Sequence, residues 1–376
     1  MAQSLQKRPP ILRHFHDLKD PRLDRKKRHL LSDIIAITIC AVICGAEEWT
    51  EIVQFGNAKL AWFKTILALP SGIPSHDTFG RVFSLLDPKS LQDCFPRWMA
   101  CVRDKTGGEV VAIDGKTLRN SFDKASSKAA IHMISAWGDG NGCVFGQLKV
   151  DSKSNEITAV PRLLELLELS GCIVTMDAMG CQKEHAKLIK AKGADYVLAL
   201  KGNQGHFHDE VKNFFDDALK TNFEDLPRQV LSTTEKDHGR IEISKYRLVT
   251  DLKWFEKAKG WPGICGVGMV ESERRTAAGN SSEVRLFCTS LNEIKPFSRA
   301  VREHWHVENC LHWSLDVTFI EDKCRIRKDN APENFAVMRH IALNLLKKET
   351  SLKLGIKAKR LQAGWNNEYL LQVLLS

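Results

Sequence analysis

The chain has 376 residues, of which 43% are hydrophobic and 27% charged, and its formal net charge is +9. This composition is typical of a folded globular protein and excludes a disordered chain. The longest apolar run, Ile34–Ala46, is shorter than the roughly twenty residues that a membrane-spanning helix needs. We therefore expect a buried helix there and no contact with a membrane.

The eleven cysteines are scattered, and no two of them form a Cys-x-x-Cys pair. Neither a zinc finger nor a disulfide framework is indicated. The first residues lack the apolar core of a signal peptide. The expected location is the cytoplasm, where the thiols stay reduced.

Positive charge is concentrated towards the two ends of the chain. Residues 1–30 carry a net charge of +6 and residues 323–360 a net charge of +8, which leaves −5 for residues 31–322. An acidic middle between basic ends is typical of a protein that grips a polyanion at its edges. Basic segments that only keep the protein soluble would explain the pattern equally well.

Residues 1–105 predict a helical N-terminal domain, a candidate for DNA binding, because their apolar positions follow the helical period. Residues 106–220 predict the order β-β-β-α-β-α-β-α, with a hairpin around Gly138–Gly142. This order is typical of an α/β fold with a mixed sheet flanked by helices.

Three further segments complete the prediction. Residues 221–291 contain strand-like stretches between turns and predict a β-rich insertion. Residues 292–350 predict the C-terminal helices of the core, with Pro296 opening the first of them. Residues 351–376 predict a basic C-terminal tail.

Asp114 and Asp177 each follow a short apolar strand. Taken singly, Asp114 with Gly115 suits a hairpin turn, and Asp177 suits the cap of the next helix. Taken together, they stand at the ends of two strands of one sheet. Neighbouring strands lie about 4.8 Å apart, so the two carboxylates are candidates to share a divalent ion.

Glu308 is the third candidate carboxylate. On a continuous helix from Pro296, it falls on the apolar stripe that includes Val307 and Leu311, which predicts a core-facing side chain. A carboxylate there needs a cation or a hydrogen-bond partner. Three carboxylates suit two magnesium ions, which lie about 3.5–4 Å apart and act on a phosphodiester from both sides.

A zinc site built from His304, His306, His312 and Glu308 is the rival interpretation. His304 and His312 would lie about 12 Å apart along the axis of an α-helix, too far to close on one ion. His306 would be rotated about 160° from Glu308. The zinc interpretation is therefore disfavoured, and contact with phosphate suits these histidines better.

A resemblance rests on the stretches AIDGKTLRNS, TMDAMGCQ, GADYVLALKGNQ, HGRIE and HWHVENCLHWSLDVTFIED. With these, the chain resembles the H-repeat-associated, insertion-sequence type of DDE transposase over nearly its full length. The resemblance implies an RNase H-like fold with Asp114, Asp177 and Glu308 as a triad that holds two Mg²⁺ ions, or Mn²⁺ in their place.

The resemblance also implies an activity and partners. The activity is cleavage of double-stranded DNA at the ends of an insertion element, followed by strand transfer into a target. The paired ends suggest a homodimer, and the expected place is the bacterial nucleoid. Two alternatives stay open: a site-specific nuclease without strand transfer, and a DNA-binding protein whose catalysis has lapsed.

The chain departs from the wider superfamily in one respect. The signature Tyr-x2-Arg-x3-Glu-x6-Lys is represented here by Val301, His304, Glu308 and Leu315. A protonated His304 is a candidate to replace the arginine as a phosphate contact. Lys323, Arg325 and Arg327 are candidates for the lysine role.

Further candidates for contact with DNA lie near the triad or in the insertion. They are Lys116, Gln182, Lys201, His238, Arg240, His304, Arg325 and Arg327. Trp254 and Trp261 are candidates to stack on an extruded base, although packing is the commoner role of such residues.

Overall fold

The computed structural model describes residues 9–102, 107–122, 128–150, 155–224, 226–237, 239–277 and 279–376. His238, one of the candidate DNA contacts, lies outside these residues. No helix in these ranges is long and apolar enough to cross a membrane.

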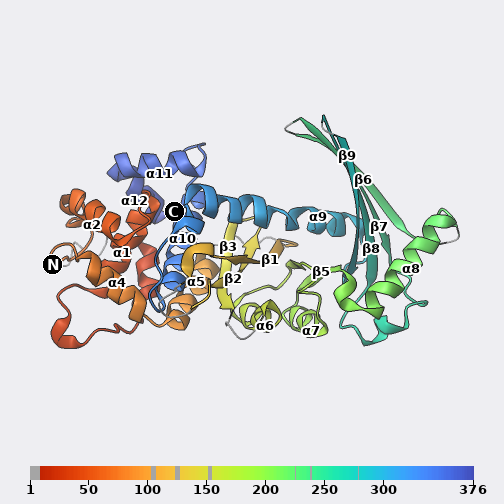
Figure 1. The fold of residues 1–376 in the computed structure, drawn as a ribbon, viewed down its shortest axis with the longest axis horizontal. Coiled ribbons are helices and arrows are strands. Elements are labelled where there is room, and N and C mark those ends of the chain that lie inside the picture. The colour runs from red at the N-terminus through yellow and green to blue at the C-terminus, as the bar shows by residue number, and fades with distance from the viewer. Residues whose placement is uncertain are drawn as a thin grey trace.

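One end of the molecule is a bundle of helices from both ends of the chain (Figure 1). Its helices are α1 Leu31–Ile43, α2 Trp49–Ala58, α3 Leu60–Phe63, α4 His76–Leu85, α5 Pro88–Val102, α10 Ala331–Lys348, α11 Ile356–Trp365 and α12 Asn367–Leu375. The apolar run lies in α1, which is buried on nearly all sides and packs against α10. The Ser75 side chain caps α4 by accepting a hydrogen bond from the amide of Thr78.

The C-terminal residues 351–376, predicted as a basic tail, are largely helical. Residues 356–375 form α11 and α12, which pack against α10. Tyr369, Leu370 and Val373 are buried in the core. The apolar side of these short helices therefore makes them part of the helical bundle.

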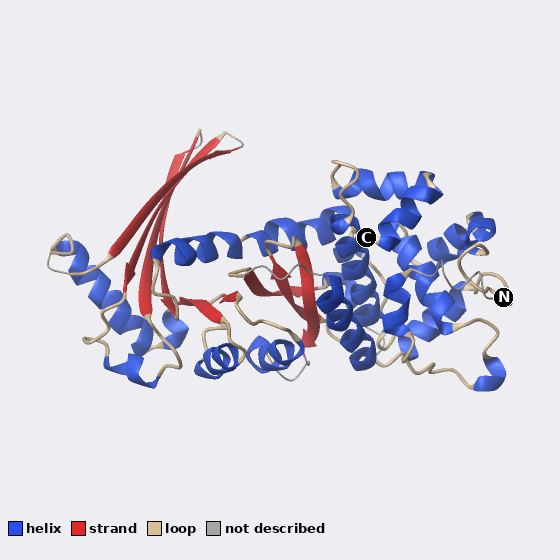
Figure 2. Cartoon of the chain, turned by 180° about the vertical axis from the view of Figure 1, so that it is seen from behind, coloured by secondary structure: helices blue, strands red, loops and turns tan. Residues whose placement is uncertain are grey.

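The middle of the molecule is a mixed sheet flanked by helices, as predicted (Figure 2). Its strands are β1 Val110–Thr117, β2 His132–Gly138, β3 Cys143–Val150, β4 Ile173–Met176 and β5 Asp195–Leu200. They lie in the order β3-β2-β1-β4-β5. The first three are antiparallel, whereas β1, β4 and β5 are parallel. This arrangement agrees with the predicted RNase H-like sheet.

Helices cover both faces of this sheet (Figure 1). Helices α6 Glu156–Leu166 and α7 Lys183–Ala191 lie on one face, and α9 Ile294–His304 lies on the other. Helix α8 His206–Lys220 follows β5 along the chain. The turn suggested for Asp114 and Gly115 is wrong, because β1 continues to Thr117 and pairs with β2 along that length.

The insertion extends the same sheet to nine strands. It contributes β6 Gln229–Asp237, β7 Arg240–Val249, β8 Gly266–Thr276 and β9 Gly279–Thr289. Strand β9 pairs antiparallel with β5, and the far ends of the four strands project beyond the body (Figure 1). Strands β7, β8 and β9 correspond to the strand-like stretches RIEISKYRLV, ICGVGMVESERR and EVRLFCTSL of the sequence, whereas β6 has no such counterpart.

Helix α9 is fixed against the insertion by a close contact with β8. A Cβ atom on Gly268 would lie 2.2 Å from the ring of Phe297, so the helix approaches this strand more closely than a side chain would allow. Phe297, Ala300 and Val301 are buried in the same cluster. The helix that leads to Glu308 is thereby held on the sheet.

Beyond His304 the helix widens. Residues Val307–His312 and Ser314–Thr318 form two π-helical stretches instead of the predicted continuous α-helix. A π-helix has i→i+5 hydrogen bonds, and such segments are frequent at functional sites. The rotation of 100° per residue assumed for the apolar stripe does not hold there.

Candidate active site

Asp114 and Asp177 lie next to each other at the centre of the sheet. Strands β1 and β4 pair in parallel, and the last paired positions are Ile113 and Met176. The two aspartates are the following residues on each strand. Because adjacent strands are about 4.8 Å apart, the register brings the two carboxylates together.

The surroundings of Asp114 are acidic. The pKa of the Asp114 carboxyl is raised to about 6, chiefly by burial; a hydrogen bond from the Gly115 amide opposes this rise, and the charges of Asp177, Glu156 and Glu308 add to it. Three other carboxyl groups therefore act on Asp114 at this point of the sheet. Such a cluster favours either a bound proton or a cation.

Asp177 does not cap helix α7, whose N-cap is Gln182, and instead holds the loop between β4 and α7. Its Oδ1 accepts hydrogen bonds from the amides of Met179 at 3.0 Å and Gly180 at 3.2 Å. The same loop is held by side-chain amides of Asn203 and Gln204, both of which donate to the carbonyl of Ala178. The loop that carries Asp177 is thus fixed from two sides.

Glu308 is exposed, so the prediction that it faces the core is wrong. The π-helical turns change the direction of the side chains after His304, and Val307 and Leu311 remain buried while Glu308 does not. Glu308 is still near Asp114, because its charge raises the pKa of the Asp114 carboxyl. Asp114 and Asp177 are therefore adjacent, and Glu308 lies within electrostatic range of Asp114 on the solvent side.

The donor set suits a hard divalent cation, since all three candidates offer carboxylate oxygens. Within the described ranges, no group of three or more His, Cys, Asp or Glu side chains is close enough to hold an ion. The chemistry of the donors therefore fits a metal, and a three-ligand site requires Glu308 to approach the two aspartates.

The three histidines around Glu308 do not converge on one point. His304 shares a hydrogen bond of 2.9 Å with Thr175, His306 donates to Asp139 at 2.7 Å, and His312 lies 3.6 Å from Asp114. These separate contacts give the zinc interpretation no support.

His304 is unsuited to replace the arginine of the superfamily as a cation. Burial, and then the nearby Arg285, lower the pKa of the His304 imidazole to about 4. The ring is therefore neutral at physiological pH and holds α9 to β4 through Thr175. The expectation of a protonated His304 is wrong, because the sequence did not reveal its burial.

The remaining candidates have different surroundings. The Gln182 side chain donates to the carbonyl of Met179 at 3.2 Å. Lys201, Arg240 and Arg325 are exposed, at the end of β5, at the start of β7 and in the segment before α10. Arg327 donates to the carbonyl of Asn120 at 2.8 Å and lies over the ring of Phe122.

Lys116 points into a group of carboxylates and is described below. Trp254 and Trp261 stack on Phe214 and Phe207, with ring centroids 3.9 and 4.7 Å apart. Both tryptophans therefore pack against aromatic side chains of α8; Trp261 is buried, whereas Trp254 stays partly open to solvent.

Sequence reasoning missed a second polar pair beside Asp114. His132 donates to Glu156 at 2.6 Å, and its other ring nitrogen shares a hydrogen bond of 2.9 Å with Thr117. The pair lies over Gly115, where an added Cβ would be 2.2 Å from Oε1 of Glu156. The pairing of β1 with β2 and the packing of α6 on β2 bring these residues together, so no local pattern signals them.

Gly115→Ala is therefore expected to push the His132–Glu156 pair away from β1. Such overpacking typically destabilises a protein by about 1–3 kcal/mol, and we expect a loss in that range in chemical denaturation. Gly202→Ala is the control, because no atom lies within 4 Å of the added Cβ. Gly142→Ala is unsuitable, because a φ of +59° at this position would itself strain an alanine. Equal stabilities of the Gly115 and Gly202 variants would contradict the expectation.

Comparison with known proteins agrees with this arrangement. The family model described as Transposase DDE domain matches residues 105–345, and the model described as DDE_Tnp_1-associated matches residues 12–99. The chain is 42% identical to the putative transposase YncI of Escherichia coli O157:H7, over 97% of this chain and 94% of that protein.

Two further similarities complete the comparison. The H repeat-associated putative transposase YhhI of Escherichia coli K12 is 41% identical over 97% of both chains. A solved piggyBac transposase synaptic complex with hairpin DNA aligns with 98% of this chain and 77% of that one, at 13% identity and a TM-score of 0.43. The match to the catalytic-domain model and the full-length relatives establish that the chain belongs to the DDE transposase family.

Proposed function

We propose that the chain is an active DNA transposase that cleaves phosphodiester bonds at the ends of an insertion element and transfers the freed strand. The observation that carries the proposal is the position of Asp114 beside Asp177, with the charge of Glu308 acting on the same carboxyl. Carboxylates forced together in this way are typical of sites for phosphoryl transfer.

Asp114, Asp177 and Glu308 would hold the metal, with Mg²⁺ as the physiological ion and Mn²⁺ as its substitute. The chemistry that two such ions supply when bound is activation of the attacking hydroxyl and stabilisation of the leaving oxygen. The protein contributes placement: the amides of Met179 and Gly180 hold Asp177 through its Oδ1, and pairing of β1 with β2 holds Asp114. Glu308, on the π-helical stretch Val307–His312, would supply the third carboxylate.

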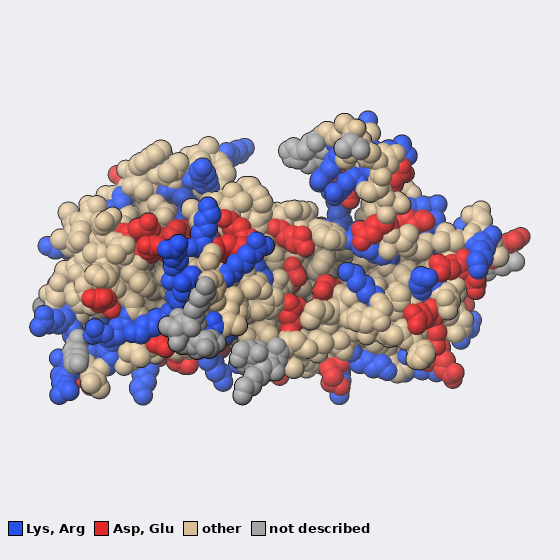
Figure 3. Space-filling view, in the orientation of Figure 1, with Lys and Arg blue, Asp and Glu red and all other residues tan. Residues whose placement is uncertain are grey.

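Double-stranded DNA is the proposed partner, as element end and as target. Lys and Arg side chains gather along the lower edge of the end built from the helical bundle (Figure 3). Not all of the basic C-terminal segment is available, because Arg339, Lys359 and Arg360 are buried. The exposed basic residues of this end would contact phosphates, without reading sequence. Pairing of two DNA ends would make the working form a homodimer, at the nucleoid.

The test uses the full chain and a supercoiled plasmid that carries the DNA flanking the gene on both sides. We expect binding of this DNA in Ca²⁺, cleavage only with Mg²⁺ or Mn²⁺, and joined products with a second plasmid. Cleavage without joining would favour the nuclease alternative. Binding without cleavage in either metal would favour a DNA-binding protein with lapsed catalysis and would overturn the proposal.

A further inference from the structure

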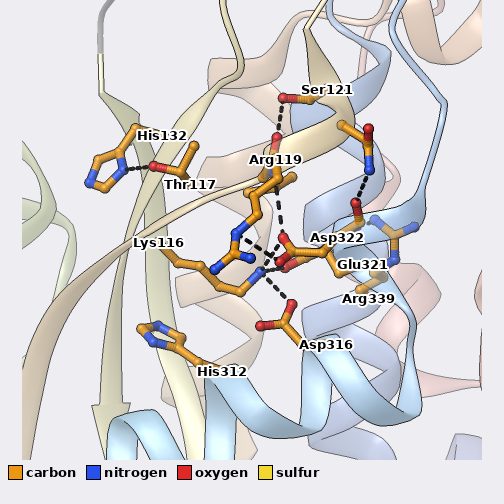
Figure 4. A network of polar contacts seen from close by, with 12 residues as sticks. Lys116, Thr117, Arg119, Ser121, His132, His312, Asp316, Glu321, Asp322 and Arg339 are labelled. Atoms are coloured by element: carbon orange, nitrogen blue, oxygen red, sulfur yellow. Dashed lines mark hydrogen bonds and ion pairs between the residues drawn. The ribbon is translucent and has the colours of Figure 1, made fainter.

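Lys116 lies two residues after Asp114 on β1, and its ammonium group is surrounded by carboxylates (Figure 4). Nζ is 2.7 Å from Asp316, 3.0 Å from Glu321 and 3.4 Å from Asp322. The Lys116 side chain is only 12% exposed. A DNA phosphate would meet these negative charges, so Lys116 is a poor candidate for the DNA contact that its sequence position suggested.

The ion pair between Lys116 and Asp316 links the side of the candidate site that carries Asp114 to the side that carries Glu308. Asp316 belongs to the π-helical stretch Ser314–Thr318, which continues directly from the stretch that carries Glu308. The contact between Lys116 and Asp316 therefore ties the strand of Asp114 to the segment of Glu308. The other two carboxylates come from the turn Glu321–Lys323, which follows that segment.

A second cation holds the far end of the same segment. The Arg360 guanidinium of α11 donates to the carbonyl of Thr318, and it also pairs with Glu47 at 2.8 Å. Glu47 pairs in turn with Arg339 of α10 at 3.2 Å, and Arg339 lies 3.8 Å from Glu321. The π-helical segment is thus anchored on one side to β1 and on the other to the helical bundle.

Burial makes this network rigid. Glu321 and Arg339 are 2% and 1% exposed, and buried charges of this kind stay in place only when they are paired. Neighbouring polar groups that orient the residues of a metal site typically affect metal affinity or activity strongly.

We propose that Lys116 is a positioning residue that holds the Glu308 segment against β1 through Asp316, so that Glu308 can meet Asp114 and Asp177. The inference rests on the proposed function, because it assigns Lys116 a task in the assembly of that site. Lys116 would thereby act on the π-helical segment that carries Glu308. The lysine position of the superfamily signature, seven residues after Glu308, is Leu315 in this chain.

The decisive comparison is between Asp316→Asn and Asp322→Asn. Each change removes one carboxylate from Lys116, but only Asp316 lies on the π-helical segment. Both side chains are partly exposed, at 34% and 22%, so both variants are expected to fold. Lys116→Met is less suitable, because it would leave the buried Glu321 without its closest cation.

For Asp316→Asn we expect kcat for plasmid cleavage and the affinity for Mn²⁺ to fall by about 10- to 100-fold, the range typical of residues that orient metal ligands. Mn²⁺ affinity is measured by titration with electron paramagnetic resonance, without DNA. DNA affinity in Ca²⁺ is expected to stay at the wild-type value, and Asp322→Asn to stay close to wild type in all three measurements. Lys116→Arg, which keeps the charge, is expected to retain most of the activity.

Equal losses in Asp316→Asn and Asp322→Asn would overturn the proposal, as would wild-type Mn²⁺ affinity in Asp316→Asn. A loss of DNA affinity that accounts for the whole loss of cleavage would assign the network to DNA binding and would also overturn it. If the wild-type protein cleaves no DNA, the proposed function fails. The Mn²⁺ titration then still decides whether Asp316 positions the metal ligands.

Discussion

Asp177→Asn is expected to abolish DNA cleavage while leaving the fold and DNA binding intact. Asparagine has the size of aspartate, and its side-chain oxygen can still accept the hydrogen bonds from Met179 and Gly180 that fix the loop. What is lost is the negative charge next to Asp114. A metal ion stabilises a phosphoryl-transfer transition state by several kcal/mol, which corresponds to a loss in rate of about 10³-fold or more.

The measurement is single-turnover cleavage of the plasmid with flanking DNA, in Mg²⁺, together with a gel shift in Ca²⁺. Asp195→Asn is the matched control. Asp195 begins β5 and therefore lies at the end of the parallel strands opposite to Asp177. Its carboxylate pairs with Lys190 at 2.7 Å. Cleavage at the wild-type rate by Asp177→Asn, or by Asp114→Ala or Glu308→Ala, would show that the triad is assigned wrongly.

The sequence was a good guide to the elements of the sheet because their signals are local. Apolar strands such as Ile173–Met176 are bounded by glycine on either side, and the hairpin around Gly138–Gly142 carries turn residues. The positions of Asp114 and Asp177 follow from these strands. Strand β6 was missed because its residues are mostly polar, and alternate residues from Val230 to Lys236 are exposed.

The sequence was a poor guide to Glu308, for a reason of geometry. The apolar pattern after Pro296 correctly predicts a helix on the sheet, and Val307 and Leu311 are buried as expected. However, a helical wheel assumes one rotation per residue, and the π-helical stretches break that assumption. The hydrogen bond of Ser314 to the carbonyl of Cys310 and the contact of Arg360 with Thr318 hold this segment, and neither is visible in the local pattern.

Long-range charge pairs were the least predictable part of the site. Lys116 meets Glu321 across 205 positions of sequence, and His132 meets Glu156 only because β1, β2 and α6 pack together. Residue type and spacing suggested that Lys116 binds phosphate, whereas its burial among carboxylates argues for a role within the protein. Such partners depend on the packing of whole elements, which periodicity does not encode.

Asp114→Asn is expected to stabilise the metal-free protein at neutral pH, although it should also abolish cleavage. Burial and the neighbouring carboxylates raise the pKa of Asp114 to about 6 from its ordinary 3.8. A raised pKa means that the folded protein binds the proton more tightly than the unfolded chain, so the associated stability is complete below about pH 4 and is lost as the pH rises through about 6. At pH 7.5 the ionised Asp114 costs about 3 kcal/mol, and asparagine avoids this cost.

Chemical denaturation in EDTA measures the effect, at pH 7.5 and again near pH 4. The variant should be more stable than wild type by up to about 3 kcal/mol at pH 7.5, and the difference should nearly vanish near pH 4, where Asp114 is protonated in the folded protein. Adding Mn²⁺ at pH 7.5 should stabilise wild type more than the variant, because a bound cation relieves the same repulsion. A variant less stable than wild type at pH 7.5 would mean that Asp114 contributes to the fold, and the crowding of carboxylates would then be no sign of a catalytic metal site.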